Sequence, residues 1–243
     1  MATPRRNRPL VALRALQELV RDPDDLPQVF RIIDALPGRS LERILARTRR
    51  SDAGRRLLAA RPDLGARLSD RAALAALPPD TLGGAYFELT ERAKISAQGI
   101  VDASIAAGDA APAPTDPEVE WVGNRMRDTH DLWHVVTGYQ TDVIGELALL
   151  AFTFAQAPHL GIGLIVGFGY LQQFPQVNQH IRKGYRRGRR AAWLPAVAWE
   201  ALLDQPLDAV RVQLGIDEIP VYEPIPSAAL RSGQVALRFG ASA

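Results

Sequence analysis

Residues 127–146 read RDTHDLWHVVTGYQTDVIGE, and they place two histidines, an aspartate and a glutamate where one helical hairpin could bring them together. His130 and His134 are four residues apart, so an α-helix stacks them on one face, with Asp131 beside them. Glu146 lies twelve residues beyond His134, about 18 Å along an unbroken helix. The four side chains can therefore meet only if the first helix ends and the chain turns back.

A turn of this kind is favoured by the residues between His134 and Glu146. Gly138 can end the first helix, because glycine readily adopts the left-handed conformation that closes a helix. Thr141 or Asp142 can then cap a second helix. In the resulting antiparallel pair, His134 lies one turn before the first helix ends and Glu146 lies one turn after the second begins.

The residue types at this hairpin indicate a metal site. Two imidazoles and two carboxylates suit zinc, iron(II), manganese or cobalt. We therefore expect a divalent metal ion held by four ligands: His130, Asp131, His134 and Glu146. These residues would be catalytic as metal ligands. The alternative is that His130 caps a helix, His134 is a buried hydrogen-bonded histidine and the acids are solvated. Cysteine is absent, which excludes disulfides, thiolate chemistry and cysteine-rich zinc sites.

The rest of the chain predicts an all-α fold, a single-domain multi-helix bundle with the metal site across the hairpin. Apolar residues recur at helical spacing in residues 9–22, 26–36, 41–49, 52–60, 194–203 and 207–214. Asp116 and Pro117 predict the start of the helix that carries the metal motif. We expect an N-terminal helical extension (1–50), a metal-binding core (51–217) and an irregular C-terminal tail (218–243).

A long stretch without charged side chains raises the question of a membrane span. No Asp, Glu, Lys or Arg occurs in residues 147–181, but Pro158 and His159 divide this stretch into pieces shorter than the roughly 20 residues that a span needs. Buried helices are the favoured interpretation. The glycines within it would permit tight helix contacts or leave room for a slender apolar ligand.

A basic cluster follows directly, formed by Arg182, Lys183, Arg186, Arg187, Arg189 and Arg190. Such a cluster can bind a phosphate or carboxylate, dock on anionic lipid or be a solvated helix face. We predict substrate binding by Arg186, Arg187, Arg189 and Arg190. No nucleic acid is expected, since no recognition fold and few interleaved aromatics accompany the charge. The N-terminus lacks a secretory pattern, which favours the cytoplasm.

The sequence resembles the coenzyme Q biosynthesis protein 4 family, whose signature is His-Asp-x-x-His, eleven residues, then Glu. His130, Asp131, His134 and Glu146 match it. Further landmarks follow in the family's order over residues 50–217: AGRRLLAARP (53–62), LPPDTLGGAYF (77–87), GRRA (188–191), WE (199–200) and LGI (214–216).

The resemblance implies an all-helical fold and a divalent metal, usually zinc, held by those four residues. It implies that the protein binds or converts polyprenylated hydroxybenzoate or quinone intermediates and contacts other ubiquinone-biosynthesis enzymes. It also implies peripheral association with the inner face of the membrane. The implied activity is oxidative decarboxylation at ring carbon 1. The alternatives are a non-catalytic, metal-stabilised scaffold and, less favoured, a metal-dependent phosphohydrolase. The native metal, the oxidant and whether the chain forms a homodimer stay open.

Overall fold

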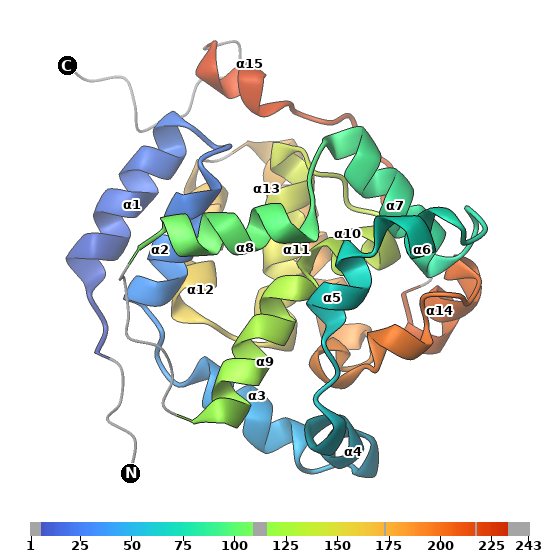
Figure 1. The fold of residues 1–243 in the computed structure, drawn as a ribbon. Coiled ribbons are helices and arrows are strands. Elements are labelled where there is room, and N and C mark those ends of the chain that lie inside the picture. The colour runs from blue at the N-terminus through green and yellow to red at the C-terminus, as the bar shows by residue number, and fades with distance from the viewer. Residues whose placement is uncertain (1–5, 109–115, 173, 217, 233–243) are drawn as a thin grey trace, which may run out of the picture.

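The computed structural model describes residues 6–108, 116–172, 174–216 and 218–232, and the regular structure within them is helical (Figure 1). The α-helices of the N-terminal half are α1 (Pro9–Arg21), α2 (Leu26–Ala35), α3 (Ser40–Thr48), α4 (Asp52–Ala60), α5 (Leu64–Ser69), α6 (Arg71–Ala75), α7 (Leu82–Ala93) and α8 (Ala97–Ala106). Those of the C-terminal half are α9 (Pro117–Asp128), α10 (His130–Thr137), α11 (Val143–Gln156), α12 (Leu160–Leu171), α13 (Pro175–Arg190), α14 (Leu207–Leu214) and α15 (Ser227–Arg231). The all-α prediction is confirmed.

Helix α11 is central, and α13 packs along it more extensively than any other pair of described helices. Two glycines of α13 make this close approach possible. A Cβ atom at Gly184 would lie 2.1 Å from the carbonyl oxygen of Ala148, and one at Gly188 would lie 2.5 Å from that of Phe152. Any larger side chain would push the two helices apart, so the backbone spacing here depends on glycine.

Most of the uncharged stretch lies in α11 and α12. Helix α11 is largely buried, as predicted, whereas α12 is only partly buried and exposes Leu160, Tyr170 and Leu171. Helix α11 ends at Gln156, and α12 begins at Leu160 after the side chain of His159 accepts a hydrogen bond from the Gly161 amide. Gly161 packs directly on the backbone of α2 at Ile32. Of the helices that the structure describes, none combines the length and the apolar character that a bilayer span requires.

The N-terminal helices pack into the rest of the molecule. Ala12, Leu16 and Ile32 form one apolar cluster with Ile165 of α12, and Leu147 of α11 packs against it. In Figure 1, α8 and α9 lie in front of α11, α12 and α13, while α1 and α2 flank them. Helices α1 and α2 therefore help to enclose the interior beside α11, and the division into an N-terminal extension, a core and a tail stays a prediction.

The helix predicted at residues 194–203 is wrong. Two short 3₁₀ helices, Leu194–Ala196 and Trp199–Ala201, take its place. A tertiary contact interrupts the backbone between them, because the Val197 carbonyl, which would pair within an α-helix, accepts a hydrogen bond from Arg125. The Leu194 amide, at the start of the segment, donates to the side chain of Gln156. The described part of the tail is also more ordered than the composition indicated, since it ends in α15.

Candidate metal centre

The predicted helical hairpin is present. Helix α10 ends at Gly138, which adopts a left-handed φ of +74°, and its amide donates to the His134 carbonyl. Asp142 caps α11 by accepting a hydrogen bond of 3.0 Å from the Ile144 amide. The sequence had left Thr141 and Asp142 as alternative caps, and the structure selects Asp142.

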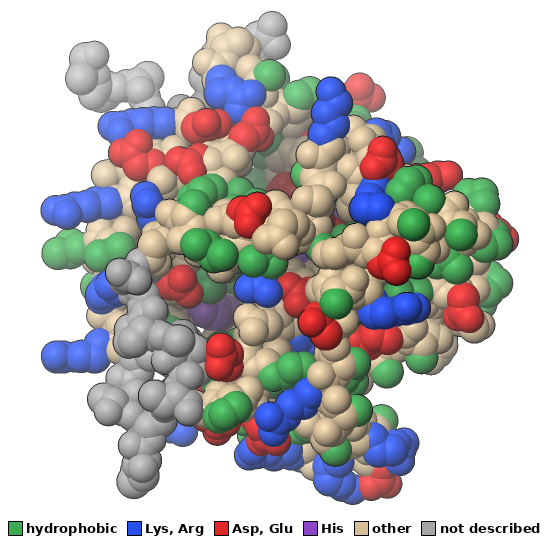
Figure 2. All heavy atoms as spheres, viewed as in Figure 1, with side chains coloured by type: hydrophobic (Ala, Val, Ile, Leu, Met, Phe, Trp, Pro, Cys, Tyr) green, Lys and Arg blue, Asp and Glu red, His purple; other side chains and the backbone are tan. Residues whose placement is uncertain are grey.

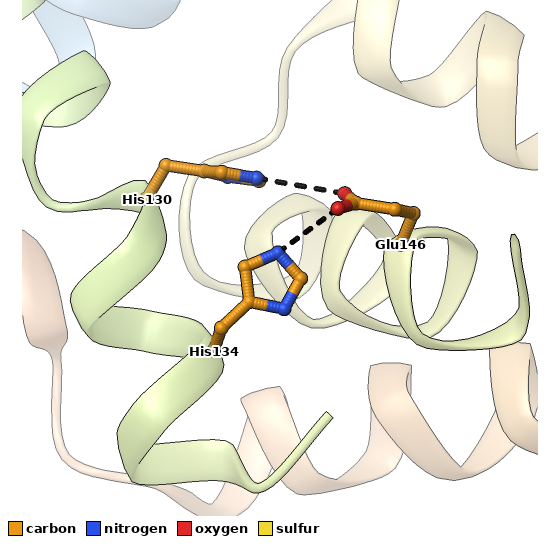
Figure 3. A group of neighbouring side chains, drawn as sticks. All are labelled: His130, His134 and Glu146. Carbon is orange, nitrogen blue, oxygen red and sulfur yellow. Dashed lines mark ion pairs between the residues drawn. The ribbon is translucent and has the colours of Figure 1, made fainter. Parts of the chain in front are cut away.

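Three of the predicted ligands meet across this hairpin (Figure 3). Nε2 of His130 lies 3.5 Å from Oε2 of Glu146, and Nε2 of His134 lies 3.2 Å from Oε1 of the same carboxylate. The imidazole rings are nearly perpendicular, with centroids 4.9 Å apart. One ligand atom from each residue lies within 4.8 Å of the others, so these two histidines and one glutamate could hold a metal ion, and we call them the metal-ligand cluster.

The donor set and its surroundings fit a divalent metal ion. Nδ1 of His134 donates to the carbonyl oxygen of Tyr139 at 3.0 Å, which orients the ring and turns Nε2 toward Glu146. A histidine ligand held by its second nitrogen is typical of protein metal sites. Ligands of one tetrahedral zinc ion lie about 3.3 Å apart, so small side-chain rotations would complete the geometry.

Asp131 is near the metal-ligand cluster but is not one of its three members. Its side chain is buried, and no donor among the described residues reaches Oδ2. Burial raises the pKa of this carboxyl, while His130 and His134 act in the opposite direction. A nearby dication would stabilise the buried carboxylate, and its role as a direct ligand stays a prediction.

Charges inside the metal-ligand cluster shift the pKa values of its members. Burial alone would lower the pKa of His134, but the Glu146 carboxylate overcomes this effect and raises it to about 9. Burial would raise the pKa of Glu146, whereas the two imidazoles hold it well below its usual range. Near neutral pH the metal-free protein therefore carries a proton on His134, and a metal ion must displace this proton.

We expect the affinity for cobalt(II) to rise between pH 6.5 and 8.5, by up to about tenfold per pH unit, because binding releases the His134 proton. The stability of the metal-free protein has the opposite pH dependence and falls as the pH rises. A raised histidine pKa stabilises the protein below about pH 6.5, and this contribution is lost as the pH rises toward 9. Thermal unfolding with and without cobalt should therefore show a gap in Tm that widens with pH. A constant gap would contradict the proton displacement.

An apolar cavity of about 1120 Å³ adjoins the metal-ligand cluster, with His130 and Glu146 in its wall. Helices α1, α2, α11 and α12 supply much of its apolar lining, including Leu16, Val29, Ile33, Leu150, Ile165 and Phe168. The face drawn in Figure 2 is hollowed beside α8, and a histidine side chain (purple) is visible within the hollow. The sequence left open that residues 147–181 make room for an apolar ligand, but it could not predict which helices enclose the cavity, because they are distant in the chain.

The basic cluster lies apart from this cavity. None of Arg186, Arg187, Arg189 and Arg190 lines it within the described chain. Arg187 instead donates to the carbonyl oxygens of Thr137 and Glu218 and lies over the Tyr139 ring, so it braces the end of α10. Arg186 lies with Arg182 in a second, smaller apolar groove. Substrate binding by the four arginines stays a prediction.

A C-terminal contact that the sequence did not predict fixes the turn of the hairpin. The Tyr222 hydroxyl donates to Oδ2 of Asp142 at 2.8 Å and accepts from the Gln140 amide at 2.9 Å. The Ile225 amide donates to Oδ1 of Asp142, and its carbonyl accepts from the Val143 amide. Residues 222–225 therefore hold the segment that carries Glu146 toward the two histidines.

The described part of the chain is thus an all-helical protein in which two histidines and a glutamate converge across a hairpin beside an apolar cavity and could hold a metal ion. Residues 6–220 match the family described as coenzyme Q (ubiquinone) biosynthesis protein Coq4. The chain belongs to this family. The match includes most of the first fifty residues, which the sequence landmarks did not cover.

Curated relatives agree with this membership. The chain is 30% identical over 190 residues to a mitochondrial ubiquinone biosynthesis protein COQ4 homolog of Aedes aegypti, covering 75% of this chain and 65% of the relative. It is 28% identical over 198 residues to the mitochondrial coq4 protein of Schizosaccharomyces japonicus, covering 76% of each chain. The chain thus spans a little under two thirds of the Aedes relative. Both relatives are named as mitochondrial, which differs from the cytoplasmic location that we expected.

A solved structure supports the fold. A crystal structure from Nostoc punctiforme, of a protein provisionally described as a ubiquinone biosynthesis protein, superposes with a TM-score of 0.64. The superposition covers 88% of this chain and all of the other, at 24% identity. The helical arrangement is therefore shared with a protein of known structure.

Proposed function

We propose that this protein acts in ubiquinone biosynthesis as a metal-dependent enzyme that oxidatively decarboxylates a polyprenyl-hydroxybenzoate precursor at ring carbon 1. The observation that carries the proposal is the position of His130 and Glu146 in the wall of the large apolar cavity. A polyprenylated aromatic acid has one polar ring and a long apolar tail. The cavity offers metal ligands for the first and an apolar lining for the second.

His130, His134 and Glu146 would hold the metal, with Asp131 as the proposed fourth ligand. Zinc is our first expectation, and iron, manganese or cobalt also suit the donors. When bound, the metal would supply Lewis-acid stabilisation of negative charge on the ring substituents. His134 is fully enclosed and anchored, whereas His130 and Glu146 are partly exposed toward the cavity. The open side of the metal-ligand cluster therefore faces the space that a substrate would occupy.

The proposed reaction breaks the bond between the ring and its carboxylate, forms a ring C–O bond and releases carbon dioxide. This is a two-electron oxidation, for which we propose dioxygen as the oxidant: the aromatic acid, dioxygen and water would give the ring hydroxyl, carbon dioxide and hydrogen peroxide. Zinc has no redox chemistry, so either oxygen reacts with an activated substrate or the native metal is redox-active.

The test is purified protein incubated with carboxyl-labelled substrate, dioxygen and each candidate metal in turn. Labelled carbon dioxide and the hydroxylated ring should appear together and should require the metal. If the protein binds the substrate but neither product forms with any metal, the alternative proposal gains: a metal-stabilised scaffold that presents intermediates to other enzymes of the pathway.

We also propose that the protein docks peripherally on an anionic membrane through the smaller groove between α12 and α13. This groove, of about 520 Å³, has an apolar lining that includes Gly163, Gly167 and Val166. Arg182 and Arg186 are one helical turn apart beside it, and two partly exposed tyrosines, Tyr170 and Tyr185, adjoin them. Basic and aromatic side chains around an apolar surface are typical of the bilayer interface.

Replacing Arg182 and Arg186 together with glutamate should weaken binding to vesicles containing anionic lipid by about tenfold or more, since each basic residue near such a surface contributes about 1 kcal/mol. Vesicle flotation measures this binding. The matched control reverses two exposed arginines elsewhere, Arg56 on α4 and Arg67 on α5. If both double variants lost vesicle binding equally, the net charge of the protein would account for the effect. That result would contradict docking through the groove.

A further inference from the structure

Acidic side chains dominate the charge around the large cavity. The carboxylates in its wall belong to Asp24, Asp34, Glu120, Asp131, Asp142 and Glu146. Within the described chain, Arg127 is the one lysine or arginine that lines it. An anionic headgroup entering this cavity would be repelled by most of the charged groups around it. A headgroup of that charge therefore needs a specific cationic contact besides the metal.

Arg127 is placed to supply this contact. It lies three residues before His130, on the same face of nearly continuous helix, where neighbouring Cβ atoms are about 5–6 Å apart. Both side chains line the cavity. Its guanidinium is therefore within a side chain's reach of the space that adjoins the metal-ligand cluster.

The guanidinium of Arg127 is fixed on one side and available on the other. Its Nε donates to Oδ1 of Asp128 at 3.0 Å, which restrains the side chain. The two terminal amino groups make no hydrogen bond to the described part of the chain. The Arg127 side chain is 21% exposed to solvent. An arginine with a restrained stem and open amino groups is well suited to bind a carboxylate through two parallel hydrogen bonds.

We propose that Arg127 binds the carboxylate of the aromatic headgroup and holds it beside the metal-ligand cluster, so that the cavity selects acidic over neutral prenylated rings. This inference rests on the proposed function and names the residue that would recognise its substrate class. Arg127 is then a substrate-binding residue, in addition to the residues that hold the metal.

The experiment measures binding to the zinc-loaded chain without oxygen, so that no turnover intervenes. The two probes are a geranyl-substituted 4-hydroxybenzoate and the geranylphenol that lacks the carboxylate. Arg127→Gln should weaken binding of the acid by about ten- to a hundredfold and change binding of the phenol by less than about twofold. Arg127→Lys should restore part of the affinity for the acid, because it keeps the charge but loses the planar fork.

Two further variants separate recognition from structure. Asp128→Asn removes the charged partner of Arg127 and should keep the preference for the acid. If Arg127 acted only through its ion pair with Asp128, the Asp128→Asn variant would instead lose this preference, as Arg127→Gln does. Arg56→Gln, at an exposed position on α4, should bind both probes like the parent chain. Equal weakening of acid and phenol by Arg127→Gln, or no weakening, would overturn the inference alone. Failure of the parent chain to bind either probe would overturn the proposed function, and this inference with it.

Discussion

Replacing His134 with glutamine should leave the protein folded but unable to retain metal, lowering metal affinity by at least about a hundredfold. The reason is the position of this ring. Nε2 lies 3.2 Å from Glu146, Nδ1 is held by the Tyr139 carbonyl, and the side chain is 1% exposed, so no other group can replace it. Metal content measured after purification without added metal, together with release of labelled carbon dioxide, provides the readout.

The control for this experiment is His180→Gln. His180 is a buried histidine of α13 outside the metal-ligand cluster, and its ring packs on Tyr222, so this variant reports any metal loss caused by altered packing around the hairpin alone. It should keep the metal of the parent chain. His130→Gln should lie between the two, since His130 is 30% exposed. If the His134 variant retained stoichiometric metal and formed product at the parent rate, the proposal that this metal-ligand cluster holds the catalytic metal would be wrong.

The hairpin was predictable from sequence because its determinants are local. Histidines four residues apart share a helix face, Gly138 closes the helix and Asp142 caps the next one, and each of these effects acts within a few residues. Local signals also placed the break between α11 and α12 near Pro158. These signals predicted a site of four ligands, and the structure brings three of them together, His130, His134 and Glu146, while Asp131 stays a prediction.

The cavity and its charge were not predictable in this way. Leu16 and Phe168 line the same space from helices about 150 positions apart in the chain, and such packing leaves no short-range pattern. The same limit explains the wrong helix at residues 194–203, where Arg125, far away in sequence, donates to the Val197 carbonyl that a helix would have paired with the Ala201 amide. Arg127 was visible in the sequence, but only its place in the cavity wall suggests a role.

The second large effect concerns Glu200 of the landmark WE (199–200), which forms a buried ion pair with Arg125. Nη1 and Nη2 of Arg125 pair with Oε1 and Oε2 of Glu200 at 2.8 and 2.9 Å, and Nη2 also donates to the Val197 carbonyl. The two side chains are 4% and 17% exposed. Glu200→Ala would leave a buried guanidinium without its counter-charge, so we expect it to lower the free energy of unfolding by about 3–5 kcal/mol.

Urea unfolding of Glu200→Ala measures this loss, and Glu91→Ala is the matched control. Glu91 pairs with Arg71, but its side chain is 61% exposed, so water replaces much of the lost interaction and the cost should stay below about 1 kcal/mol. Glu200→Ala should keep its metal as long as it is folded, which separates it from His134→Gln. Equal, small losses in both glutamate variants would mean that the Arg125 pair is solvated in solution, and the glutamate of the landmark would then need another explanation.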